Sequence, residues 1–122
     1  MQKLPRQVNL LLKESELVFA TPNIGIYQND SRASFILRFH RDEVELKLCT
    51  LLAFRRKIMN IDLTEMFMPD NADIEIIEIP QLKRIFVFSL REILELRELF
   101  SGTMTMLEMN SIIHEKLVRN FH

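Results

Sequence analysis

Residues 34–59, SFILRFHRDEVELKLCTLLAFRRKIM, contain a change of hydrophobic period that governs how the chain is expected to fold. Up to Phe39 the apolar side chains alternate between two faces, which is typical of a half-buried strand. From Asp42 the period lengthens, and Asp42-Glu43-Val44-Glu45 has the form of a capping box at a helix start. The stretch therefore predicts a strand up to Phe39, followed by a helix of about 17 residues that ends near Met59.

The period of two recurs on both sides of this stretch. Before it, Thr21-Pro22-Asn23 and Asn29-Asp30-Ser31 are turn formers that separate short apolar runs. After it, two runs joined across residues 80–83 carry apolar side chains on both faces, which indicates a bulge or a strand covered on both sides. The further predicted strands span residues 8–13, 16–20, 24–28, 73–79 and 84–88.

Three more helical segments are predicted after Met59. Asp62-Leu63-Thr64-Glu65 begins a short one, and Ser89-Leu90-Arg91-Glu92 begins one that ends at Phe100. Because Ser101-Gly102 is a stop signal, the last helix, to about Asn120, is expected to fold back as a C-terminal helical hairpin. The order predicts one α+β domain over residues 1–122, with a mainly antiparallel sheet of about five or six strands and three main helices on one face.

Composition removes several functional classes. The chain has 2 glycines, Gly25 and Gly102, so glycine-rich phosphate loops and dinucleotide fingerprints are absent. The net charge of −1 argues against broad nucleic-acid binding. No run approaches the roughly 18 apolar residues of a membrane helix. Cys49 has no second cysteine to pair with, and no signal peptide is visible, so we expect a cytoplasmic protein.

Signals for metal, cofactor or catalytic chemistry are weak. The sequence has no Cys-x-x-Cys or His-x-x-x-His spacing, and His40 with Asp42 lacks an evident third metal ligand. Cys49 lies among leucines, where a thiol behaves as a small hydrophobe. Ser111 and His114 lie one turn apart without the third group of a catalytic triad. We expect no metal, no cofactor and no catalytic residue.

Four polar side chains interrupt the apolar stripes of the predicted helices, namely Arg55, Arg97, Asn110 and His114. One interpretation is structural: an arginine reaches water or a carboxylate such as Glu75 or Glu78, and the other groups satisfy polar atoms in the core. The alternative is that Arg97, Asn110 and His114, together with Arg55, converge on a pocket for a small carboxylate or phosphate. Both interpretations stay open, and these four residues are the candidate ligand-binding residues.

An excess of apolar surface indicates an interface. The last helix has an apolar arc of nearly half its circumference, and the strand that contains Phe86 and Phe88 is apolar on both faces. Such surfaces mark protein interfaces, and a two-fold homodimer is the commonest way to cover them. The leading hypothesis is a non-enzymatic domain that acts through homodimerisation or a protein partner, without membrane or nucleic acid. The alternative is a small-anion-binding or enzymatic domain at Arg97, Asn110 and His114.

The segments Leu90–Leu99 and Met106–Ile113 resemble the end of a small uncharacterised bacterial family of single-domain proteins. Both segments are predicted to be helical, and Leu90–Leu99 consists almost entirely of leucine, glutamate and arginine. That family carries no assigned activity. The resemblance therefore implies a small bacterial protein and assigns no role to any residue.

Overall fold

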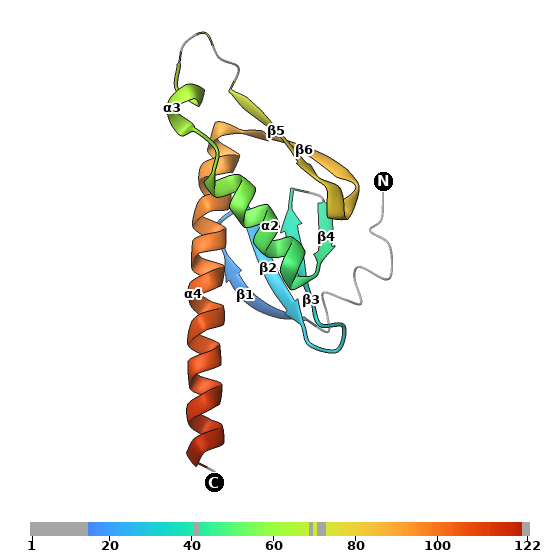
Figure 1. Cartoon of the computed structure of the whole chain (residues 1–122), viewed down its shortest axis with the longest axis vertical. Helices are drawn as coiled ribbons and strands as arrows, with labels where there is room; N and C mark the ends of the chain where they lie inside the picture. Colours follow the sequence, from blue (N-terminus) through green and yellow to red (C-terminus); the bar gives the residue numbers. More distant parts are fainter. Residues whose placement is uncertain (1–14, 41, 69, 71–72, 121–122) are drawn as a thin grey trace.

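The computed structural model describes residues 15–40, 42–68, 70 and 73–120, with side chains up to Ile112. The expected strand over residues 8–13 lies outside this part. The described chain is α+β, as the sequence predicts (Figure 1). Its elements are β1 (Glu16–Ala20), β2 (Ile24–Asn29), β3 (Ser34–Phe39), β4 (Asp42–Leu46), α2 (Leu48–Met59), α3 (Leu63–Met66), β5 (Ile74–Ile79), a 3-10 turn (Pro80–Leu82), β6 (Arg84–Ser89) and α4 (Leu90–Asn120).

Strands β1 to β4 form an antiparallel sheet in which each strand pairs with the next. Ile26 pairs with Leu37, and Leu37 with Val44, so these three side chains form a row on the same face. All three are buried, and Ile26 and Leu37 are fully buried. The alternation read from the sequence thus identifies the inner face of this sheet.

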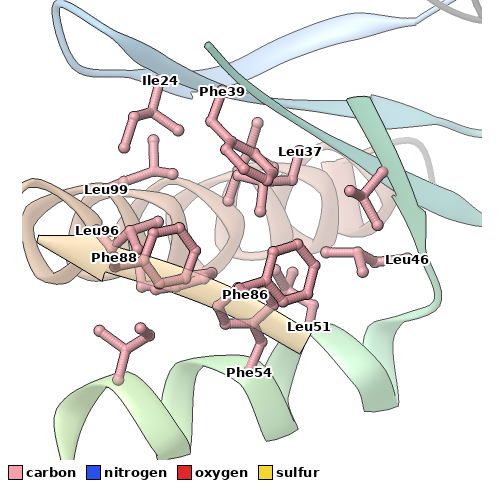
Figure 2. Packing of buried hydrophobic residues seen from close by; sticks show 14 of the residues in the cluster. Ile24, Leu37, Phe39, Leu46, Leu51, Phe54, Phe86, Phe88, Leu96 and Leu99 are labelled. Carbon is pink, nitrogen blue, oxygen red and sulfur yellow. The ribbon is translucent and has the colours of Figure 1, made fainter. Parts of the chain in front are cut away.

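Two helices cover the inner face. α4 packs against β1 and β2, and α2 packs against β3, β4 and α4. The prediction that helices cover one face is confirmed. The core between them is aromatic: the ring centroid of Phe54 on α2 lies 5.3 Å from that of Phe86 and 6.2 Å from that of Phe88, both on β6. Figure 2 shows these rings between the sheet and the two helices.

The strands of the described chain are divided between two sheets rather than joined in one. β5 and β6 form a separate two-stranded sheet, and neither is paired with β1 to β4. The inner face of this β5–β6 hairpin packs against the core through Ile77, Ile79, Phe86 and Phe88. The apolar strands predicted at residues 73–79 and 84–88 are therefore present but form a separate layer.

The start of the first long helix was predicted wrongly. Residues Asp42–Leu46 form β4, and α2 begins only at Leu48. The carboxylate of Asp42 does not cap a helix, because it pairs with Arg84 of β6 and with the N–H of the next residue. Val44 and Leu46 are buried in the sheet, and this tertiary packing outweighs the local capping signal.

The predicted helical hairpin is also wrong. α4 runs without interruption from Leu90 to Asn120 and passes through Gly102. A Cβ atom at position 102 would overlap the ring of Phe19 on β1. The glycine therefore permits a close approach between helix and strand, and it does not end the helix.

Candidate functional site

Arg97 has the most complete set of contacts among the four candidate residues. Its Nη2 donates hydrogen bonds to the backbone carbonyls of Met59, at 3.2 Å, and Ile61, at 2.7 Å. Carbonyls at the C-terminal end of a helix have no partner within that helix. Arg97 therefore caps the end of α2 from α4. Its partners are backbone oxygens and not the carboxylates of Glu75 or Glu78.

The structure does not bring Arg97 and Asn110 together. They lie thirteen residues apart on one continuous helix, which is about 20 Å at 1.5 Å per residue. Asn110 is exposed, although the helical stripe predicted it to be buried. Arg55 is half-buried on α2, and its Nε has no hydrogen-bond partner in the described part of the chain. The side chain of His114 lies outside the described residues. A ligand role for these four stays a prediction.

The outer face of the β5–β6 hairpin carries four aliphatic side chains, which we call the hairpin face: Ile74, Ile76, Ile85 and Val87. Regular alternation puts them opposite the buried phenylalanines, and the strand pairing has no bulge. Their exposed fractions lie between 51% and 64%. Ile76 and Val87 are direct cross-strand partners at the middle of the hairpin. Exposed apolar patches of this kind are characteristic of binding surfaces.

Charged groups mark the two ends of the hairpin face. The end away from the turn has exposed Asp70 and Asp73, and the turn itself has exposed Lys83. Glu78 is the cross-strand partner of Ile85, near the turn. The hairpin thus has two acidic residues at its open end, an apolar middle, and Lys83 together with Glu78 near its tip.

α4 provides a second exposed apolar area. Figure 1 shows that the helix continues well past the main sheet toward the C-terminus. Met109 is 49% exposed and Ile112 is 47% exposed. These two side chains lie three residues apart and are therefore neighbours on the surface of the helix.

A carboxylate on α4 fixes the β1–β2 turn. Glu95 accepts hydrogen bonds from the hydroxyl of Thr21 at 2.5 Å, and from the backbone N–H and side-chain amide of Asn23, both at 2.9 Å. Burial raises the pKa of the Glu95 carboxyl, but these hydrogen bonds outweigh burial and hold the pKa below its ordinary value. Glu95 therefore stabilises the junction of helix and sheet in its ionised form.

The described residues offer no metal centre. No group of three or more His, Cys, Asp or Glu side chains gathers among them in a way that could hold a metal ion. Cys49 is exposed near the start of α2, not buried among leucines as predicted. Within the same residues, no helix combines the length and the apolar character that crossing a membrane requires.

Comparison with known proteins identifies no relative of this chain. No protein-family model matches the chain, and no curated protein or solved structure matches it significantly. The resemblance of the C-terminal segments to a bacterial family gains no support from these comparisons.

Proposed function

We propose that the protein is a non-enzymatic domain that acts by self-association through the hairpin face. The observation that carries this proposal is the set of four aliphatic side chains, each more than half exposed and arranged on two paired strands. Transfer of such surface from water is favourable by about 25 cal/mol per Å². Four half-exposed side chains on each of two copies would thus provide several kcal/mol toward association.

The hairpin also has a structural reason to associate. Two-stranded sheets are only marginally stable by themselves and depend on packing against a face. Here one face packs on the core and the other is open to solvent. A second copy would cover the open face and bury the hairpin on both sides, as in a sandwich of two sheets about 10 Å apart.

The charge pattern favours a two-fold arrangement with the hairpins antiparallel. An axis across the middle of the hairpin would bring Ile76 onto Ile76 of the partner subunit, and Val87 onto Val87 of the partner subunit. The tip that carries Lys83 would then lie over the acidic open end of the other copy, with Asp70 and Asp73. Opposite charges in register favour this orientation over the parallel one.

Sedimentation velocity over a wide concentration range tests the proposal. The wild-type chain is expected to approach twice its mass of 14.5 kDa as concentration rises. Ile76→Asp, which puts a charge in the middle of the hairpin face, is expected to hold the protein at one chain.

Met109→Asp is the matched control, since Met109 is an exposed apolar residue on α4. It is expected to leave the dimer intact. A wild type that stays at one chain would contradict self-association. Loss of the dimer in Met109→Asp but not in Ile76→Asp would move the interface to the helix.

The setting we propose is the cytoplasm, where Cys49 would stay reduced.

A protein partner with an apolar strand surface is the alternative occupant of the hairpin face. Ile76→Asp should abolish binding of either occupant, and only the mass of the purified wild-type protein distinguishes them.

A further inference from the structure

A cavity of about 630 Å³ opens between the β1–β2 turn, the end of β3 and the first turns of α4. It lies away from the hairpin face. Its polar lining includes Arg38, His40 and Arg91, and its apolar lining includes Tyr27 and Phe39. Pockets for small molecules usually measure about 300–1,000 Å³ and combine an apolar wall with a few polar groups. The cavity has this size and character.

The two carboxylates in this cavity already have partners within the protein. Glu95 receives three hydrogen bonds from the β1–β2 turn. Glu92 accepts the N–H of Ser89 at 2.9 Å through one oxygen and contacts Nε2 of His40 through the other. Burial raises the pKa of Glu92, but these contacts outweigh it and keep the pKa below its ordinary value. Neither carboxylate is left to bind a cation or a donor group of a ligand.

The guanidinium groups of Arg91 and Arg38, in contrast, donate no hydrogen bond to any residue that the structure describes. Arg91 is exposed, and its side chain makes no hydrogen bond or ion pair with any residue that the structure describes. Arg38 is 53% exposed, and its nearest counter-charge is Glu43, with 3.8 Å between Nε and Oε1. A guanidinium group has five N–H donors in a fork that matches a carboxylate or phosphate. The cavity therefore offers donors to a ligand that supplies acceptors.

Glu43 is the acidic partner of Arg38. The two residues are cross-strand partners on the outer face of the main sheet. The side chain of Glu43 is only 3% exposed, and neither of its carboxylate oxygens has a hydrogen-bond partner in the described chain. Burial raises the pKa of this carboxyl, and the charge of Arg38 opposes the rise. Arg38 is thus the ion-pair partner of Glu43 without a hydrogen bond to it, which leaves the guanidinium N–H groups available to the cavity.

Gly25 makes room beside Arg38. It is the cross-strand partner of Arg38 on β2 and lines the cavity. Its φ is not positive, and a Cβ there would meet no atom closer than 3.8 Å. Neither backbone conformation nor close packing therefore requires glycine, although glycine weakens a strand. What the missing side chain does provide is space in the cavity next to the guanidinium group.

We propose that this cavity binds a small organic oxyanion, a carboxylate or a phosphate ester, through Arg38 and Arg91. Arginine side chains hold such groups with charge-assisted, bidentate hydrogen bonds, and both of these arginines line the cavity. The rest of the ligand lies against Tyr27 and Phe39. The site differs from the one predicted at Arg97 and Asn110, neither of which lines the cavity.

Nuclear magnetic resonance titration of the full chain tests this site with three probes of similar shape. Benzoate represents a carboxylate, phenyl phosphate a phosphate ester, and benzamide is the neutral control, all at constant ionic strength. The expected result is a saturable shift of the backbone amide signals of Gly25, Arg38 and Arg91 with at least one anion and no saturation with benzamide. The anion that binds more tightly shows whether the site prefers a carboxylate or a phosphate ester. Absence of saturation with both anions would overturn the proposal.

Three variants make the test specific. Arg91→Gln is expected to weaken binding of the anion by about tenfold or more, because a charged hydrogen-bond donor is lost. Gly25→Val is expected to fill the cavity and abolish binding while the melting temperature stays close to that of the wild type. Arg56→Gln, at an exposed position on α2 outside the cavity, is the control and should bind as the wild type does. Wild-type affinity in a folded Gly25→Val protein, or equal weakening in Arg56→Gln, would refute the site.

Discussion

The ring of Phe19 on β1 lies against the backbone of Gly102 in the middle of α4, where there is no room for a Cβ atom. Alanine is a better helix former than glycine by about 1 kcal/mol, so an unhindered Gly102→Ala change would stabilise the helix. Here the added methyl must displace a packed ring, which costs about 1–3 kcal/mol. We therefore expect Gly102→Ala to lower the free energy of unfolding in a urea titration.

Replacing Phe19 with the smaller leucine separates the gain in helix propensity from the clash with the ring. In a Phe19→Leu background the same Gly102→Ala change should cost less or become stabilising, because the clash is relieved. The coupling between the two substitutions in a double-mutant cycle measures the contact directly. Additive effects would show that Gly102 is not required by Phe19.

Arg97 caps α2, so its removal should destabilise the fold. Arg97→Met keeps the apolar stem but leaves the carbonyls of Met59 and Ile61 without this donor. A hydrogen bond to a charged group contributes about 1.5–3 kcal/mol, and we expect a loss of this order in chemical denaturation. Arg56→Met, at an exposed position on α2, is the control and should change stability little. A neutral or stabilising effect of Arg97→Met would contradict the capping role and favour the predicted ligand role of Arg97.

Glu95 should make stability depend on pH. Its pKa in the folded protein lies below the ordinary value of 4.5, so its contribution is complete above that pH and is lost as the pH falls through the folded pKa. Glu95→Gln is expected to cost about 1–2 kcal/mol at pH 7. The difference from the wild type should shrink in acid, where the wild-type carboxyl takes up a proton.

Thermal unfolding between pH 7 and pH 3 measures this dependence. Glu98→Gln, an exposed glutamate on the same helix, is the control for the loss of one negative charge. A difference between Glu95→Gln and the wild type that stays constant with pH would mean that the hydrogen bonds from Thr21 and Asn23 do not depend on ionised Glu95.

Regular alternation made much of the sheet predictable. The strands expected at residues 16–20, 24–28 and 34–39 are present with nearly the same bounds, because each has an inner face that the core requires. The prediction that a helix begins at Asp42 was wrong, because it relied on a local signal alone. Its capping pattern is local, whereas Val44 and Leu46 are held by pairing with β3. The prediction that a helix ends at Gly102 was wrong because the ring that packs against this glycine, Phe19, comes from a strand far away in the sequence.

The candidate site was predicted less well. A polar residue on a buried helical stripe correctly marked Arg97 as unusual, but its partners are carbonyls at the end of another helix, which no spacing reveals. Asn110 interrupts the stripe predicted for the last helix, yet it is exposed, because α4 continues past the main sheet toward the C-terminus (Figure 1). Glu92 and Glu95 gave no functional signal, because glutamates on the polar side of a helix are common. Their partners on the β1–β2 and β3–β4 turns appear only in three dimensions.

The apolar pattern of residues 73–88 was recognised, but its meaning changed. Apolar residues on both faces indicated a bulge or a covered strand. The pairing of β5 with β6 is regular, and the outer side chains, such as Ile76 and Val87, are exposed. This combination is the basis of the proposed self-association.

A distance measurement between spin labels tests whether two copies meet through the hairpin face. A label at Val87→Cys, in a Cys49→Ser background, would lie near the proposed two-fold axis, with the two sheets about 10 Å apart. Dipolar electron paramagnetic resonance at concentrations where the dimer forms is then expected to show strong coupling at short range. A label at Ile112→Cys on α4 should show no such short distance. Absence of coupling at position 87 in a protein that sediments as a dimer would contradict association through the hairpin face.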